Sequence, residues 1–142
     1  EEKQRLDMNY VARHHGRKTE SLMESSGVLS GEAFKLFRGT IDFVKGCPGS
    51  VGNEKEDVLL LGDDVVNQTI PLILCTEEDV KGSHGASIGE LEQGMLFYFE
   101  ARGISKSEAE KIVAKARLEK LCQETADEKA AEYMHQKIEE VI

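Results

Sequence analysis

The stretch EDVKGSHGASIGELEQGMLFYFEARGI, residues 78–104, changes its apolar pattern near Glu90 and so divides the chain into two predicted parts. Before Glu90, short apolar stretches alternate with Gly, Asn, Asp and Ser, which is typical of strands joined by turns. From Glu90 onward, apolar residues recur at the three- and four-residue spacing of helices. We therefore predict an all-β core over residues 1–89 and a small helical module over residues 90–142.

The segment FKLFRGTIDFV, residues 34–44, illustrates the strand pattern. Two apolar pairs recur in it at a period of two, namely Phe34 with Leu36 and Ile41 with Phe43. Between the pairs, Arg38-Gly39 breaks the phase. This pattern predicts one strand with a bend at Arg38-Gly39.

The arrangement of the strands is open to three interpretations, a sandwich, a barrel or a parallel β-helix, because periodicity alone does not separate them. The chain has no two-residue Asn-Gly hairpin turn, and the polar run Asn67-Gln68-Thr69 suits a corner between strands. Both observations favour stacked coils over hairpins.

Three helices are predicted in the second part. The first carries the apolar residues Leu91, Met95, Phe97, Tyr98 and Phe99 and ends in a left-handed cap at Gly103. The second begins at Ser105, which forms a capping box with Glu108, while Ile104 forms a hydrophobic staple. The predicted apolar face of the second helix consists of Ala109, Ile112, Val113, Ala116 and Leu121. That of the third consists of Ala130, Tyr133, Met134, Ile138 and Val141.

Composition excludes several classes of function. A formal charge of −9 repels phosphate backbones, which argues against a nucleic-acid partner. No apolar run approaches the roughly 18 residues that span a bilayer, and the first ten residues lack the pattern of a secretory signal. Three widely spaced cysteines suit a reducing compartment, so we expect a cytoplasmic protein.

Few side chains suggest chemistry. The sequence has no phosphate-binding glycine loop and no nucleophile elbow, and the acidic run at 77–79 suits a solvated turn better than an enzyme site. The pair His14-His15 lacks metal-ligand spacing and suits a strand residue followed by a turn residue. We expect Cys75 and Cys122 to be buried as small apolar residues, and Cys47 to be the most exposed cysteine.

His84 is the sharpest candidate, because Ser83, Gly85 and Ala86 around it allow another chain segment to approach closely. A neutral imidazole is a common ligand for iron or zinc. The alternative is a structural histidine whose ring bonds a carbonyl at a corner of the sheet. The residues alone favour this structural role.

Three stretches resemble the SufB/SufD family of iron–sulfur cluster assembly proteins. Residues 78–104 are similar to the family pattern DDVKxSHGAxxGxLxxxxLFYxxxRGI, of which the SHGA, LFY and RG parts are specific. Upstream, GVLSGEAFKLFRGTIDF (27–43) and LLLGDDVVNQTIPLIL (59–74) resemble two further family stretches. The chain is identified as a SufD-like member that is truncated or short, lacking an N-terminal part of the coil stack.

The resemblance implies a right-handed parallel β-helix of few coils followed by a helical C-terminal module. It implies a non-catalytic scaffold that pairs with itself or with a SufB/SufD sibling and docks an ABC-type ATPase through its helices. Candidate docking residues are Phe97, Tyr98, Arg102 and Gly103. His84 becomes the candidate for metal binding and for building a transient iron–sulfur cluster, the one cofactor implied.

Two positions depart from the family pattern. SufD-like members commonly have a cysteine two residues before the motif histidine, where this chain has Gly82. SufB-like members have a cysteine shortly before the LLIG strand, where this chain has Glu56. An adaptor that docks the ATPase without building a cluster is therefore the alternative function. An enzyme on a β-helix is a third hypothesis, which requires a cluster of carboxylates on one face of the coil.

Overall fold

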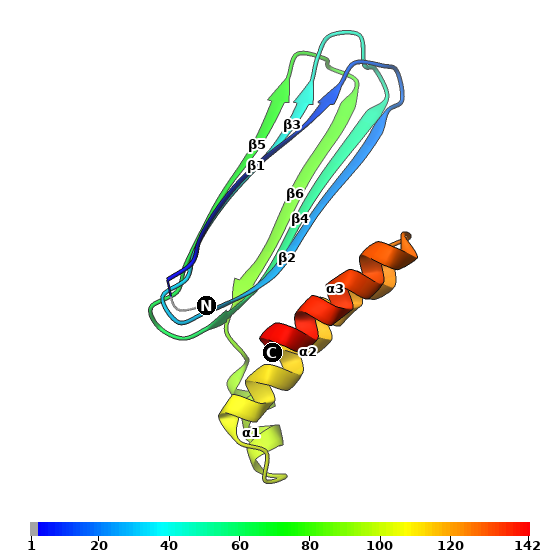
Figure 1. Ribbon diagram of the computed structural model, residues 1–142. Helices are drawn as coiled ribbons and strands as arrows, with labels where there is room; N and C mark the ends of the chain where they lie inside the picture. The colour runs from blue at the N-terminus through cyan, green and yellow to red at the C-terminus, as the bar shows by residue number, and fades with distance from the viewer. Residues whose placement is uncertain (1–2) are drawn as a thin grey trace. The chain divides into compact units, whose positions relative to one another are not determined.

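The computed structural model describes residues 3–142, which form six strands followed by three helices (Figure 1). The strands are β1 (Arg5–His14), β2 (Glu20–Ser30), β3 (Phe34–Phe43), β4 (Ser50–Leu61), β5 (Val66–Cys75) and β6 (Val80–Gly89). The helices are α1 (Gln93–Glu100), α2 (Lys106–Glu124) and α3 (Glu128–Val141). The predicted order of strands followed by three helices is confirmed. Within residues 3–142, no helix is both long and apolar enough to cross a membrane.

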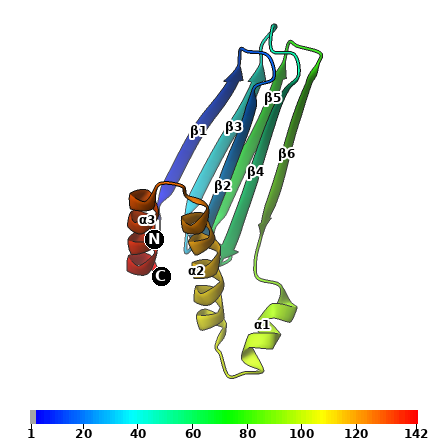
Figure 2. The ribbon, with the colours of Figure 1, turned by 90° about the vertical axis from the view of Figure 1, so that its right-hand side faces the viewer.

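The strands form two three-stranded sheets with the orders β1-β3-β5 and β2-β4-β6. The chain passes to the other sheet after every strand, so each strand pairs with the strand two positions along the chain (Figures 1 and 2). The first sheet is parallel, with Arg5 opposite Phe34 and Phe34 opposite Val66. Such alternation is compatible with stacked coils, whereas hairpins would join consecutive antiparallel strands.

Two compact units divide the chain, and each has its own core. The β unit consists of the residues up to 25 together with 30–57 and 62–87. The helical unit consists of 26–29, 58–61 and 88–142, so it includes short pieces of β2 and β4.

Strand β3 shows which side chains face the interior of the β unit. From Phe34 to Ile41 the more buried positions alternate as Lys35, Phe37, Gly39 and Ile41, and the last two residues, Asp42 and Phe43, are both buried. The pairing register of β3 with β1 and β5 also continues through Arg38-Gly39. The predicted break in phase at this dipeptide is therefore wrong. Gly39 takes an inward place because the Glu54 carboxylate fills the space that a side chain would need.

The burial of two cysteines also differs from prediction. Cys47 is fully buried with Ile41 and Phe43, although it lies in the turn after β3. Cys75 is exposed because it ends β5, which has only one strand neighbour in its sheet. Cys122 is half-buried. All three cysteines are free thiols.

The helical unit packs around Leu59, Leu91, Leu96, Ala109 and Ala114. The capping box of Ser105 with Glu108 is confirmed, and Ile104 packs against the same core.

The predicted apolar faces are only partly correct. In α1, Phe97 is 73% exposed while Leu96 is buried. In α2, Ala109 and Ala114 are buried, and Ile112 and Ala116 are exposed. In α3, Ile138 is buried, whereas Ala130, Tyr133 and Val141 are exposed. Among the described residues, the helices have few packing partners, so part of each apolar stripe stays in solvent.

Candidate functional site

His84 lies on β6, the end strand of the sheet β2-β4-β6. The Ser83 hydroxyl donates a hydrogen bond of 2.6 Å to Oδ1 of Asn53, which sets residues 83 and 53 side by side. Gly82 faces the interior, since a Cβ built there would come within 3.1 Å of both Phe43 and Ile73. Side chains alternate between the two faces of a strand, so residues two apart share a face. His84 therefore lies on the same inner face as Gly82.

Because Ser83 bonds Asn53, the residue of β4 that follows alongside His84 is Glu54. Glu54 is only 3% exposed, and its Oε2 has no hydrogen-bond partner among residues 3–142. Burial raises the pKa of the Glu54 carboxyl above its usual range. The charge of His84 opposes this rise in pKa, and the nearby Glu56 adds to it. A buried carboxylate without a bonding partner therefore lies beside an exposed imidazole.

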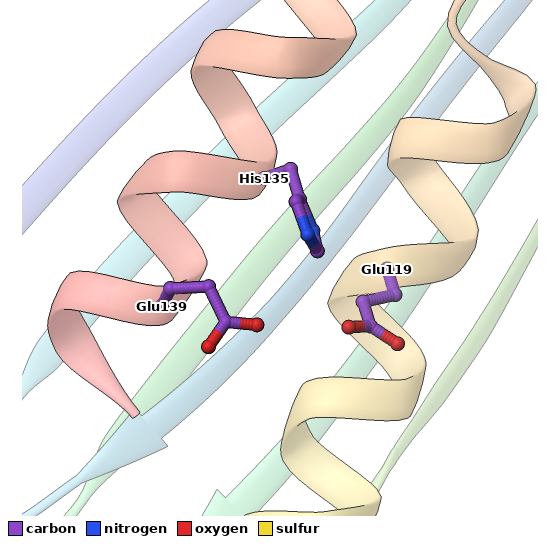
Figure 3. A group of neighbouring side chains, drawn as sticks. All are labelled: Glu119, His135 and Glu139. Atoms are coloured by element: carbon purple, nitrogen blue, oxygen red, sulfur yellow. The ribbon is translucent and has the colours of Figure 1, made fainter.

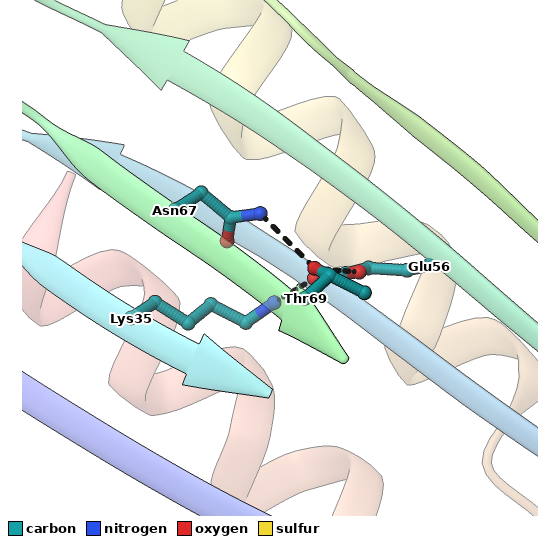
Figure 4. A network of polar contacts seen from close by, with 4 residues as sticks. All are labelled: Lys35, Glu56, Asn67 and Thr69. Carbon is teal, nitrogen blue, oxygen red and sulfur yellow. Dashed lines mark hydrogen bonds and ion pairs between the residues drawn. The ribbon is translucent and has the colours of Figure 1, made fainter. Parts of the chain in front are cut away.

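Glu56, two residues further along β4, is fully engaged (Figure 4). It forms an ion pair with Lys35, and these two side chains are 1% and 3% exposed. The Thr69 hydroxyl donates a hydrogen bond to the second Glu56 oxygen, and Asn67 donates one of 3.3 Å to that hydroxyl. Oδ1 of Asn67 is buried without a partner within the described chain. Polar side chains thus line this part of the interior of the β unit.

His14 has a structural role. It ends β1, is 4% exposed and stacks on Phe43 with the ring centroids 4.7 Å apart. Its Nδ1 lies 2.6 Å from the Thr19 hydroxyl and its Nε2 lies 2.9 Å from the Ser21 hydroxyl. Both ring nitrogens therefore have partners inside the protein. Of the predicted strand residue followed by a turn residue, the strand position of His14 is confirmed, and His15 lies between the strand and the turn.

The four predicted docking residues lie at the C-terminal end of α1. Phe97 and Tyr98 are 73% and 55% exposed, and the Arg102 guanidinium lies 3.5 Å from the centroid of the Tyr98 ring. Gly103 has φ +78°, the left-handed conformation predicted for the cap. The Ile104 N–H donates to the Phe99 carbonyl at 3.1 Å, which fixes this reversal of the chain. The four residues form an exposed cationic and aromatic surface.

A second group of possible metal ligands was not predicted from the sequence. Glu119 of α2 and His135 and Glu139 of α3 place one ligand atom each within 4.8 Å of one another (Figure 3). Lys115 already forms an ion pair with Glu139, which lowers the pKa of Glu139 and raises the pKa of Lys115. The i, i+4 spacing of His135 and Glu139 is visible in the sequence, whereas the approach of Glu119 depends on how α2 and α3 pack.

Glu54 was also not predicted, because alternation in GNEKEDV does not indicate which face of β4 is covered. The only signal in the sequence is a strand with acids at every second position.

The comparison with protein families decides where this chain belongs. Residues 1–117 match the model of the SUF system FeS cluster assembly, SufBD core domain. The chain belongs to the SufBD family. The residues that carried the resemblance, including the SHGA motif with His84, lie inside the matched range.

Curated SufBD proteins give the same result. The chain is 31% identical over 100 residues to the iron–sulfur cluster assembly protein SufD of Bacillus subtilis (strain 168), covering 70% of this chain and 23% of the relative. It is 29% identical over 130 residues to a SufBD family protein of Synechocystis, covering 92% of this chain and 27% of the relative. The chain is 30% identical over 131 residues to a SufBD family protein of Mycobacterium bovis, covering 92% of this chain and 16% of the relative. The chain thus spans less than a third of the length of these relatives.

Proposed function

We propose that this SufBD chain is a non-catalytic scaffold part for iron–sulfur cluster assembly in the cytoplasm. Membership of the family supports this role. We further propose that its strands are coils of a right-handed parallel β-helix. The alternation of strands between two sheets and the parallel register of β1-β3-β5 support that arrangement.

The observation that carries the proposal is the exposed His84 on an end strand, with a buried carboxylate beside it. Imidazole nitrogen and carboxylate oxygen are both ligands for divalent iron. An end strand leaves His84 open to solvent or to another subunit, so iron and sulfide can reach the ring during assembly. A transient iron–sulfur cluster is thus the proposed cargo of the site.

Pairing of subunits follows from the open edges of the sheets. β5 and β6 are end strands, and unpaired strand edges tend to pair with another chain. We expect a second copy, or a SufB/SufD sibling, to cover the β6 edge and bring its own side chains close to His84. A dimer with two-fold symmetry would pair the open edges of β5 and β6 in both subunits at once.

The helical unit supplies the proposed dock for a SUF-type ABC ATPase. Phe97, Tyr98 and Arg102 are exposed together, and Gly103 shapes the turn that presents them. Aromatic residues and arginine are enriched in protein interfaces because they bury large areas while keeping polar groups available.

Anaerobic reconstitution with iron and sulfide, with the ATPase and the complementary subunit present, tests the scaffold proposal. Cluster absorbance is expected for the parent chain and for His15→Ala, in which an exposed histidine outside the site is removed. The absorbance should be lost in His84→Ala. A parent chain without absorbance, or a His84→Ala variant with full absorbance, would contradict the proposal.

The adaptor that docks the ATPase without building a cluster is the second candidate. Gly82 and Glu56 favour it, because they stand where relatives have cysteines and Glu56 is already bound to Lys35. A pull-down of the ATPase that is unaffected by iron, together with failed reconstitution, would support the adaptor. Loss of the pull-down in Phe97→Ala, compared with unchanged binding in Tyr133→Ala, would place the dock at the end of α1.

A further inference from the structure

Glu54 has a buried carboxylate oxygen whose bonding partner is missing from the described residues. Only 3% of the residue is exposed, so bulk water does not compensate for the lost hydration. Folding a carboxylate into such a place is unfavourable unless a proton, a hydrogen-bond donor or a cation accompanies it. The position therefore calls for a partner.

The surroundings of Glu54 accommodate its carboxylate closely. A Cβ built on Gly39 would lie 2.4 Å from the carboxyl carbon of Glu54 and equally close to Oε2. Gly39 lies on β3, in the sheet opposite β4, so both sheets help to define the position. A glycine on an inward position of a strand is a common sign of such a close approach.

Among residues 3–142, the buried charged side chains nearest to Glu54 already have partners of their own. Lys35, the buried cation of this region, is bound to Glu56, and the other oxygen of Glu56 accepts from Thr69. His84 lies beside Glu54 on the same inner face and interacts with it electrostatically. The pair therefore presents one nitrogen and one oxygen ligand, with the imidazole on the exposed side.

We propose that Glu54 is an inward metal ligand that acts with His84, so that a single divalent first-row metal ion binds between the two side chains of one chain. This inference rests on the proposed function, for which the ion would be iron awaiting incorporation into a cluster. Mixed nitrogen and oxygen ligands suit divalent iron, cobalt and manganese. Water or a second subunit would complete the coordination shell.

Titration of the 142-residue chain with cobalt(II) alone tests this ligand role. All proteins carry His135→Ala, which removes the separate group of Glu119, His135 and Glu139 as a competing site. Binding is followed by calorimetry and by the visible absorbance of cobalt, which reports the ligands directly. The variants are Glu54→Gln and His84→Ala, with Glu78→Gln and His15→Ala as controls that remove an exposed carboxylate and an exposed histidine.

We expect one cobalt ion per chain, bound about tenfold or more weakly in Glu54→Gln and in His84→Ala, and unchanged in the controls. Cobalt should also raise the melting temperature of the parent but not that of Glu54→Gln. Glutamine keeps the shape of Glu54 and removes an unpaired buried charge, so the metal-free variant should melt no lower than the parent.

Three results would overturn the inference. The parent could fail to bind cobalt, Glu54→Gln could bind cobalt as tightly as the parent, or cobalt could raise the melting temperature of Glu54→Gln as much as that of the parent. Reconstitution with iron and sulfide then separates this failure from failure of the scaffold role. If Glu54→Gln binds cobalt normally and only His84→Ala loses the cluster, the inference is wrong and the proposed function stands. If both variants assemble clusters as the parent does, the proposed function is wrong, and the cobalt titration decides the inference separately.

Discussion

Gly39 is an inward residue of β3 that faces the carboxylate of Glu54. A methyl group at this position would lie far inside contact distance of the buried Glu54 carboxylate, so that side chain would have to shift. We expect Gly39→Ala to lower the free energy of unfolding by about 1–3 kcal/mol, as overpacking of a core does. Urea denaturation measures the change.

Gly85→Ala is the matched control for Gly39→Ala. A Cβ on Gly85 meets no atom within 4 Å, so its effect should stay within about 0.5 kcal/mol. The double variant Gly39→Ala/Glu54→Ala should lose less free energy of unfolding than the two single variants together, because the new methyl group no longer meets the Glu54 carboxylate. Strict additivity would show that the carboxylate does not limit the size of residue 39.

The Lys35–Glu56 pair is the second buried feature with a predictable cost. Replacing Lys35 by Met leaves the Glu56 charge buried with only Thr69 to bond it. We expect Lys35→Met to destabilise the protein by about 3–5 kcal/mol, measured by chemical denaturation. The double variant Lys35→Met/Glu56→Leu should recover most of that loss, since no unpaired charge remains.

The exposed pair of Lys55 with Glu24, joined at 3.5 Å, gives the surface comparison. Lys55→Met should change the free energy of unfolding by about 1 kcal/mol or less, because water screens such pairs. A Lys35→Met variant as mild as Lys55→Met would mean that solvent reaches Glu56.

At the scale of the elements, the start of α2 is fixed by reciprocal hydrogen bonds. The Glu108 N–H donates to the Ser105 hydroxyl at 3.3 Å, and the Ser105 N–H donates to the Glu108 carboxylate at 3.0 Å. Ser105→Ala should destabilise the helical unit by about 1 kcal/mol. The loss of helical circular dichroism on heating measures this effect.

The same capping box predicts a dependence on pH. The hydrogen bond from the Ser105 hydroxyl, and then that from its backbone, lower the pKa of Glu108 below its usual 4.5. The stabilisation from ionised Glu108 is complete above pH 4.5 and is lost as the pH falls through the lowered pKa. The difference in melting temperature between the parent and Glu108→Gln should therefore shrink from pH 7 to pH 3. Glu132→Gln, on the exposed side of α3, should not show this pattern.

At the scale of the whole molecule, the two units do not divide the chain at a single peptide bond. Leu59 of β4 is fully buried among Leu91, Leu96, Ala109 and Ala114 of the helical unit. Leu59→Ala should destabilise this unit by about 2–5 kcal/mol through the cavity it leaves. Hydrogen exchange of the α2 amides measures this change in stability. Leu72→Ala serves as the control, because Leu72 is 45% exposed and its loss leaves no buried cavity. Unchanged exchange in Leu59→Ala would mean that the helices are stable without β4.

Local features of this protein were predictable from its sequence because neighbouring residues decide them. The capping box of Ser105, the left-handed cap at Gly103 and the change from strand to helix after Gly89 each depend on a few consecutive residues. The SHGA, LFY and RG parts of residues 78–104 likewise indicated the family, because they lie together in one short stretch of the chain.

The interior of the β unit was decided by tertiary structure. Lys35, Glu54 and Glu56 are polar residues whose burial depends on the strand that covers them, and paired strands are far apart in the chain. The exposures of Cys47 and Cys75 are the reverse of the prediction for the same reason. Cys47 packs with Ile41 and Phe43, whereas Cys75 ends an edge strand. Periodicity gives the alternation of a strand, but only the contacts between distant segments determine which side is removed from water.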